Sequence, residues 1–293
     1  MTKRPSKTTK ARPKFTDSIA ATSVEWDIID QAFHEAAQEM AKLVQEILDR
    51  NPTNNVAALR EIQAMSWETI FTPIVTNAIA KAGTSVLTES ARREVARLGF
   101  TGFDTARDID AFGAQALMRR ANATSIAITR GSKDAITRML ANGFRDGTDI
   151  RKIAKEIEKV IGLTERHANA INNMRLTLER DGVAESEIER LTDKRAKKLR
   201  KYRAMTIART ETIHARTAAQ LVTWEAGIRD GFIKSSAQKK WLASVVGTCP
   251  ICVNLRSRPP QPLRQPYDTI TGALIQGPPS HPRCRCSLVL VGT

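Results

Sequence analysis

Aromatic residues are scarce in this sequence: Phe, Trp and Tyr together make up 5% of its 293 residues. Ala, Ile and Leu supply most of the apolar mass instead, and this balance favours helical packing over a sheet protein. The sequence also lacks any run of about 18 apolar residues, so we expect no transmembrane helix and no membrane partner. No apolar signal core follows the basic N-terminus, so no export signal is expected.

The sequence contains no pattern typical of common catalytic or phosphate-binding sites. There is no Gly-x-x-x-x-Gly-Lys-Ser/Thr, Gly-x-Gly-x-x-Gly, Gly-x-Ser-x-Gly or His-Glu-x-x-His motif. The four histidines are scattered along the chain, which leaves little material for acid–base chemistry. We therefore expect the protein not to be an enzyme.

Negative charge is absent from two short stretches that hold most of the net charge of +15. Residues 1–16 have a charge of +6, and residues 194–203 have a charge of +7. Concentrated positive charge indicates a polyanionic partner, most commonly nucleic acid, although such a run is as often a solvated helix surface. The candidate phosphate contacts are Lys194, Arg195, Lys197, Lys198, Arg200, Lys201 and Arg203.

Apolar residues at helical spacing run through the first 227 residues. We expect a disordered basic arm over 1–16 and an elongated helical body over 17–200, because strand-like alternation is absent before residue 230. The first helix should begin near Asp17 or Ser18 and stop at Asn51-Pro52. The second expected helix covers residues 56–82, with a kink at Pro73 and an end at Gly83, and the third covers 86–98 and ends at Gly99. The other expected helices cover residues 105–121, 124–142, 149–161, 164–180 and 205–226.

The chain changes character after Gly227 and becomes rich in Pro, Gly, Cys and Arg from Trp241 onward. Only short strands fit there, for example 242–246 and 287–291. A segment this poor in long apolar runs needs an internal staple to hold one shape. We therefore expect a small α+β module to follow the mainly α-helical body.

All four cysteines of the chain lie in its last 45 residues, together with one histidine. Cys-x-x-Cys presents two thiolates to one ion, and a second group from a distant loop completes a tetrahedron. Zinc in a structural role is the metal expected for such ligands. Four buried thiols or an oxidised pair are the alternatives. The five candidate donors for four positions are Cys249, Cys252, His281, Cys284 and Cys286.

A second constellation surrounds Glu211, which lies on the apolar face of the helix expected over 205–226. A carboxylate in an apolar stripe must be paired, and Arg283 or Arg285 beside the cysteines is the expected partner. Glu211 would then fix this helix to the module, with Arg209 on the opposite face and His214 as a packing histidine. The alternative role for Glu211 is a catalytic acid, for example in a transferase.

Four pieces of the sequence, in order, resemble the phage Mu F-like head morphogenesis family of minor capsid proteins. They are Ile207-Ala-Arg-Thr-Glu-Thr, Lys240-Trp241, Cys249-Pro-Ile-Cys252 and Gly277-Pro-Pro-Ser-His281-Pro-Arg-Cys284-Arg-Cys286. The resemblance covers about residues 203–290, with a weaker likeness back to about residue 143, and it implies that the small α+β module extends over 201–293. The Pro- and Arg-rich stretch 256–266 departs from the family.

The resemblance implies a non-enzymatic role in procapsid assembly of a tailed bacteriophage. The implied partners are the portal protein and the inner capsid surface, and packaged double-stranded DNA is a further expected partner. The protein would then be found in the host cytoplasm during assembly and in the interior of the procapsid or virion. The alternative function is a DNA-binding accessory protein that is packaged or ejected with the genome.

Overall fold

The computed structural model describes residues 23–51, 54–110, 113–145, 159–160, 162–244 and 247–292. The expected basic arm over 1–16, the helix start at residues 17–18 and most of the expected helix over 149–161 lie outside these residues. The helices are α1 (Ser23–Arg50), α2 (Asn55–Ala64), α3 (Trp67–Leu98), α4 (Thr105–Asp110), α5 (Gly113–Arg145), α7 (Glu165–Arg180), α8 (Glu185–Arg229) and α9 (Pro250–Ser257). The strands are β1 (Gln238–Leu242), β2 (Gln261–Pro262), β3 (Tyr267–Asp268), β4 (Leu274–Ile275) and β5 (Ser287–Val291).

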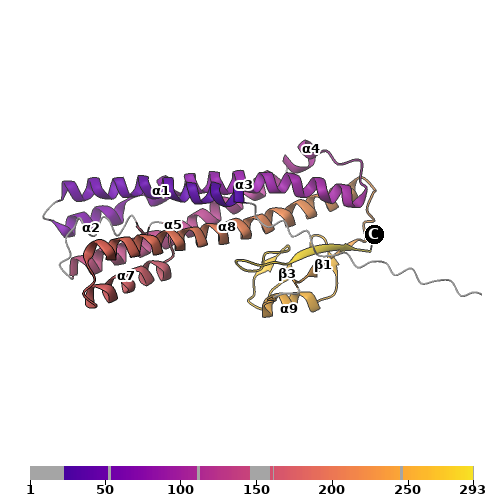
Figure 1. The fold of residues 1–293 in the computed structure, drawn as a ribbon. Helices are drawn as coiled ribbons and strands as arrows, with labels where there is room; N and C mark the ends of the chain where they lie inside the picture. Colours follow the sequence, from indigo (N-terminus) through magenta and orange to yellow (C-terminus); the bar gives the residue numbers. More distant parts are fainter. Residues whose placement is uncertain are drawn as a thin grey trace, which may run out of the picture.

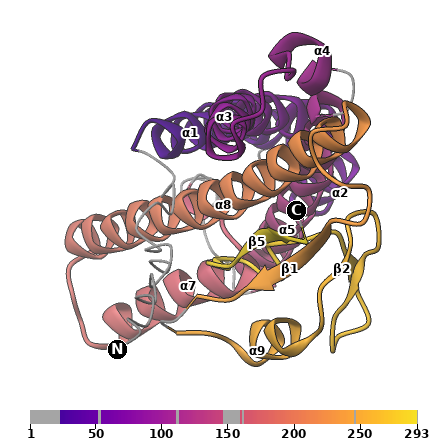
Figure 2. The same ribbon diagram turned by 90° about the vertical axis from the view of Figure 1, so that its right-hand side faces the viewer.

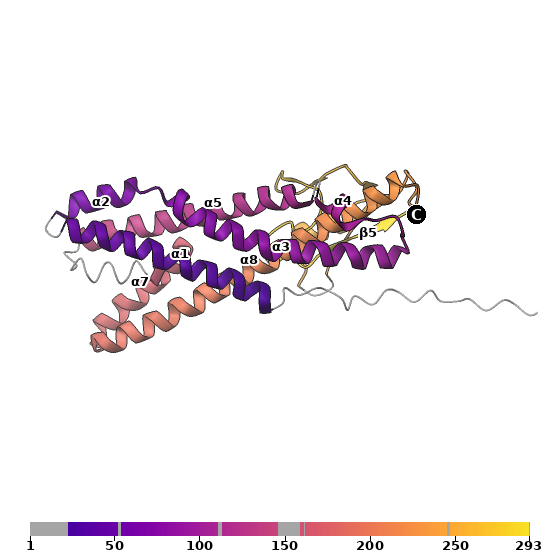
Figure 3. The same cartoon turned by 90° about the horizontal axis from the view of Figure 1, so that it is seen from above.

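The molecule is an elongated bundle of long helices with a small α+β module under one end, which confirms the predicted fold class (Figure 1). The long helices α1, α3, α5 and α8 pack against one another, and α7 packs on α5 and α8. Seen from above, α3 runs along the bundle from the α2 end to the α4 end (Figure 3). Their shared core is apolar, with Phe33, Trp67 and Phe71 among its largest fully buried side chains.

Helix α3 replaces two helices expected on either side of Gly83. The prediction that Gly83 ends a helix is wrong, because α3 continues through both Pro73 and Gly83 to Leu98. A side chain on Gly83 would place its Cβ 2.7 Å from a methyl group of Leu117, so the glycine permits close packing of α5 on α3. The predicted end at Gly99 is confirmed: its φ of +68° gives a left-handed helix cap.

Helix α3 is long and apolar enough to cross a membrane by length and composition alone. However, most of that apolar stretch is buried inside the bundle, against α1, α5 and α8. This burial is the pattern of a core helix.

Helix α8 is the element that joins the body to the module. It was expected over 205–226, but it extends unbroken from Glu185 to Arg229 and so runs past the expected limit of the body at residue 200. Its first part packs on α1 and α7, and the module lies beneath its last part (Figure 1). Trp224, near its end, is fully buried in the core of the module.

The module consists of an antiparallel sheet in the order β2-β1-β5, a hairpin of β3 and β4, and α9. Figure 2 shows β1 and β5 between α8 and α9. The strand expected over 287–291 is confirmed as β5, whereas the one expected over 242–246 lies earlier in the chain, as β1. In the register, Trp241 of β1 faces Leu288 of β5, and both side chains are buried in the module core.

Candidate metal centre

The first pair of predicted metal ligands lies at the start of α9. Cys249 is the N-cap of this helix, and its sulfur accepts the backbone N–H of Cys252 at 3.4 Å. Pro250 occupies the first helical turn, where its fixed φ and missing N–H suit the helix start. The helix N-terminus therefore holds both sulfurs on one side and favours their thiolate forms.

The second group of ligands is presented by a tight turn. The backbone N–H of Cys284 donates to the carbonyl of His281 at 3.1 Å, and Arg283 between them has φ of +63°. With Pro282 at the second position, this is the pattern of a type II turn, although that turn usually has Gly where Arg283 stands. The turn brings His281 and Cys284 to the same side, towards the start of α9.

Two of the three distances between these donors match tetrahedral coordination, and the third is shorter. The sulfurs of Cys252 and Cys284 are 3.8 Å apart, and the Nε2 of His281 lies 3.1 Å from the sulfur of Cys249 and 3.6 Å from that of Cys252. Around one ion with metal–sulfur bonds of about 2.3 Å and metal–nitrogen bonds of about 2.0 Å, tetrahedral angles place sulfurs about 3.8 Å apart and sulfur and nitrogen about 3.5 Å apart. The cluster can therefore hold a metal ion.

The five predicted donors form two overlapping groups that share Cys252. One group contains Cys249, Cys252 and His281, and the other contains Cys252, Cys284 and Cys286; within each, the donor atoms lie within 4.8 Å of one another. Cys252, Cys284 and Cys286 are buried. The donor atom of Cys252 therefore lies within 4.8 Å of the donor atoms of each of the other four residues.

The ionisation of the sulfurs follows from their mutual contacts. The pKa of the Cys284 thiol is lowered because the thiols of Cys252 and Cys286 donate hydrogen bonds to its sulfur. The same contact with Cys284 raises the pKa of Cys252. The cluster thus already favours one thiolate at Cys284, which is the ligand form of cysteine.

His281 is held in the tautomer that a metal requires. Its Nδ1 lies 2.8 Å from the carbonyl oxygen of Pro282, and because a carbonyl only accepts, Nδ1 must carry the proton. Nε2 is then unprotonated and faces the sulfurs of Cys249 and Cys252. A hydrogen bond from the distal ring nitrogen to a carbonyl is the usual support of a metal-bound histidine.

Ser280 is a member of the site that the sequence analysis missed. Its hydroxyl lies 3.2 Å from the sulfur of Cys252 and 4.0 Å from that of Cys284. It can therefore support the sulfurs as an outer hydrogen-bonding partner. The only signal in the sequence is its position directly before His281.

The metal-binding loop is fastened to α8 by its backbone and by Arg283. The backbone N–H of Arg283 donates to the hydroxyl of Thr210 at 3.1 Å, and its guanidinium donates to the Tyr202 hydroxyl at 2.6 Å. The same guanidinium lies over the Tyr202 ring, 5.2 Å from its centroid. Further along α8, the side chain of Gln220 donates to the carbonyl of Leu288 in β5 at 3.3 Å.

The predicted partner of Glu211 is wrong. Its carboxylate is buried as expected, but it accepts from Arg120 at 3.3 Å and from Thr124 at 3.1 Å, both on α5, rather than from Arg283 or Arg285. Glu211 therefore fixes α8 to the helical body and not to the module. Burial raises its pKa, and the charge and hydrogen bond of Arg120 oppose that shift.

Arg209 on α8 and Arg285 in the His281–Cys286 loop lie close enough to each other for their charges to interact. Burial lowers the pKa of Arg209, and the positive charges of Arg285 and Arg283 lower it further. Arg209 therefore lies near both loop arginines, on the opposite side of α8 from Glu211, as the sequence predicts. The nearby His214 has its pKa lowered to about 4, chiefly by burial.

The predicted nucleic-acid residues lie on α8 and differ in accessibility. Lys194, Arg195, Lys197, Lys198 and Lys201 are exposed, and Arg200 is half-buried. Arg203 departs from the prediction: its guanidinium donates to the carbonyl of Gly162, and burial lowers its pKa to about 10. Arg203 is thus a packing residue between α8 and the start of α7, whereas five of the others can meet a ligand from solvent.

Comparison of the chain with protein-family models, with curated proteins and with solved structures finds no match. The likeness to the Mu F-like family stays a prediction from the sequence. Function must therefore be inferred from the chain's own residues and contacts.

Proposed function

We propose that this protein is a minor head protein of a tailed bacteriophage that acts in procapsid assembly beside the portal. The sequence resemblance is the basis of the proposal, and one contact supports it most directly. Thr210 of the Ile207–Thr212 motif accepts the backbone N–H of Arg283, which lies within the His281–Cys286 motif. Two motifs that are 73 residues apart in the sequence thus form one structural unit, as is expected if they serve a common purpose.

In this proposal the metal is zinc, and its role is structural. Thiolates and one imidazole at tetrahedral separations are the ligands that zinc prefers. Five protein donors are present for four positions, so the protein itself can fill the coordination sphere, which favours a contribution to folding. The zinc would hold the His281–Cys286 loop against α9 and thereby give the module a fixed surface for its partners.

Quantitative mass spectrometry of purified procapsids, assembled with and without the portal protein, tests the assembly role. We expect a few copies per particle, lost when the portal is omitted. A Cys252→Ser variant should also be missing from the particles, whereas Val253→Ser, on the exposed side of α9, should be incorporated normally. Absence of the unaltered chain from both kinds of particle would refute the proposal.

A second candidate function, a DNA-binding accessory protein, is favoured by the exposed basic residues of α8. Lysines on one helix contact phosphates without regard to sequence, and such binding weakens steeply with salt. Replacing Lys194, Lys197 and Lys198 by Glu should abolish DNA retention and leave capsid incorporation intact. Loss of incorporation with DNA binding unchanged would instead exclude the accessory role.

A further inference from the structure

Two arginines and no acidic residue line a cavity beside the metal donors. The cavity has a volume of about 320 Å³, and its walls include Arg283, Arg285, Thr248 and the donors Cys249 and His281. Both arginine side chains are exposed. Because none of the described residues that line it is acidic, an anion that enters the cavity meets two arginines and no carboxylate.

Arg209 of α8 brings a third positive charge close to Arg283 and Arg285. Its neighbour in the chain, Thr210, accepts the backbone N–H of Arg283, which places the loop directly against this turn of α8. Arg209 is half-buried, and its pKa is lowered by burial and by the charges of Arg285 and Arg283. Three guanidinium groups held near one another repel, so their arrangement would be stabilised by a bound anion.

The three arginines lie at one end of a longer basic stripe on α8. At about 100° per residue, Arg195, Lys198, Tyr202 and Arg209 fall within roughly 60° of one another around the helix. Lys198 and Arg209 are about 17 Å apart along its axis, at about 1.5 Å per residue. Tyr202, between them, is 41% exposed and has Arg283 over its ring.

We propose that Arg209, Arg283 and Arg285 bind a backbone phosphate of nucleic acid, and that the metal positions two of them. Guanidinium groups suit phosphate oxygens because they donate in pairs from a planar fork. A polynucleotide presents one phosphate per strand about every 3.4 Å of duplex axis, so the length of the stripe corresponds to several phosphates. Arg283 and Arg285 alternate with the donors His281, Cys284 and Cys286, and loss of the metal would therefore release both.

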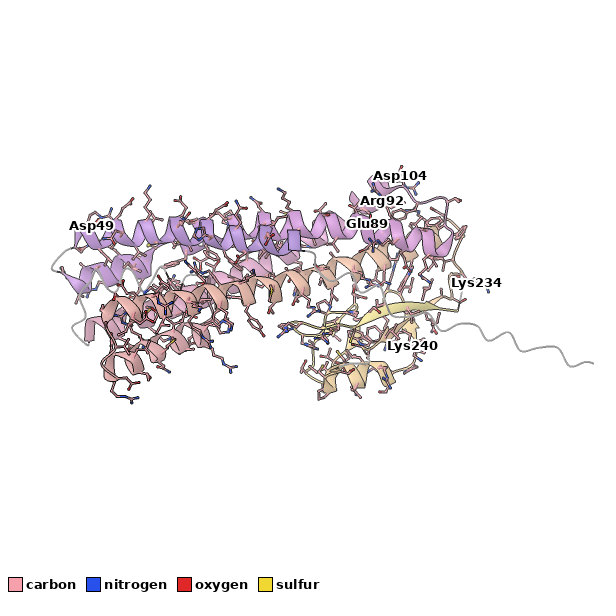
Figure 4. All side chains as sticks on the ribbon, in the orientation of Figure 1. Asp49, Glu89, Arg92, Asp104, Lys234 and Lys240 are labelled. Atoms are coloured by element: carbon pink, nitrogen blue, oxygen red, sulfur yellow. The ribbon has the colours of Figure 1, made fainter. Side chains whose placement is uncertain are left out.

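The site differs from the run of residues 194–201 and does not depend on the role in head assembly. The test is the affinity of the full-length, zinc-loaded protein for a labelled mixed-sequence duplex of about 20 base pairs, measured by anisotropy over a salt series. The variants are Arg209→Ala alone and Arg283→Ala with Arg285→Ala. The matched control removes two exposed charges elsewhere, Arg92→Ala with Lys240→Ala, on α3 and on the module (Figure 4).

We expect the loop double variant to bind about tenfold more weakly at about 0.1 M salt, with a salt slope smaller by about 1, since loss of one phosphate contact removes about 0.9. Arg209→Ala should lose about half of that slope change, and the control should change little. Zinc content, measured by elemental analysis, should be one ion per chain in every variant. Chelation of the unaltered protein should weaken binding as much as the double variant does.

Three results would overturn the proposal. The first is equal loss in the control and in the loop variant, which would mean that only net charge matters. The second is loss of zinc from the arginine variants, which would mean that these arginines serve to balance the thiolate charge. The third is stronger competition by polyglutamate than by unlabelled duplex, which would assign the site to an acidic protein. Glu replacements at Lys194, Lys197 and Lys198 test the neighbouring run separately.

Discussion

The helical body and the C-terminal module are held together by different forces. The body has a long apolar core, in which Phe33 and Phe71 pack with ring centroids 6.2 Å apart and Trp67 is 1% exposed. The module has a smaller core around Trp241 and Tyr267, and it also buries thiols and a lysine. Apolar burial can stabilise a bundle of this size, whereas a small module needs internal cross-links.

The two regions meet along α8, and the contacts there are polar as well as apolar. Trp224, in the module core, donates from its indole nitrogen to the buried carboxylate of Glu94 on α3 at 2.7 Å. At the same end, Asp108 of α4 accepts from Arg107 and Arg229, which lowers its pKa to about 2. The comparison therefore predicts that the module can lose its order while α8 stays packed on the body.

Removing the metal should produce the largest difference between the two regions. If the module holds the proposed structural zinc, replacement of Cys252 by Ser should abolish zinc binding and lower the free energy of local unfolding of the module by several kcal/mol, because the binding energy of a structural metal adds to the folding free energy. Hydrogen exchange should become fast over residues 238–292 and stay slow in α3. Val253→Ser is the matched control, and unchanged exchange in the module of the Cys252 variant would refute a structural metal.

A cavity in the core of the helical body should destabilise the body and leave the module unchanged. Phe71 is 0% exposed, and its replacement by Ala should lower the free energy of unfolding of the body by about 3–5 kcal/mol. Zinc content should be unaffected, because the module core is separate. Denaturant unfolding with parallel metal analysis checks both points, with the exposed Lys81→Ala on the same helix as the control. Zinc release by the Phe71 variant would show that the two cores are one cooperative unit.

Acid should lower the free energy of unfolding of the body, because His214 is protonated more readily in the unfolded chain than in the folded one. Its pKa is about 6.5 in the unfolded chain and about 4 in the folded one, because burial disfavours the charged ring. The unfolded chain then binds more protons between these values, so stability is full above pH 6.5 and falls as the pH drops towards 4. The loss at pH 4.5 should be on the order of 2 kcal/mol.

The effect of His214 is separated from acid release of the metal by comparison with a variant. The difference in α3 hydrogen-exchange protection between pH 7 and pH 4.5 should shrink in His214→Gln. It should not shrink in His34→Gln, which alters an exposed histidine of α1. An equal loss in all three proteins would show that His214 is not the group responsible.

Much of this architecture could be predicted from periodicity and from residue chemistry. Helical spacing predicted a mainly helical body, the glycine at position 99 predicted the end of α3, and five donor residues predicted the cluster that could hold a metal ion. These features are local, or depend on which residue types suit one ion. Gly83 shows the limit, because a glycine that ends a helix and one that admits Leu117 of a neighbouring helix have the same sequence pattern.

The partner of Glu211 could not be predicted for a related reason. The helical wheel correctly placed this carboxylate on a buried face, but it cannot tell which element covers that face. Arg283 and Arg285 were chosen because they lie beside a motif, whereas Arg120 is 91 residues away on α5. Lys239 was missed entirely, since a lysine within Lys239-Lys240-Trp241 gives no sign in the sequence that it is buried.

Lys239 provides the last test of the difference between the two regions. Its burial should make the module more stable as the solution becomes mildly basic. Its ammonium is 0% exposed, donates to the carbonyl oxygen and to the side-chain oxygen of Gln276 at 2.8 and 2.9 Å, and has its pKa lowered from 10.5 to about 8 by burial. Between these values the unfolded chain binds more protons, so the free energy of unfolding should rise with pH, by on the order of 2 kcal/mol between pH 8 and 10. Tyr267, whose pKa is raised to about 12, opposes this trend only above pH 10.

The rise of the free energy of unfolding with pH should vanish in Lys239→Met and persist in Lys240→Met, whose side chain is exposed. A slope that survives in the Lys239 variant would assign the pH dependence to another group.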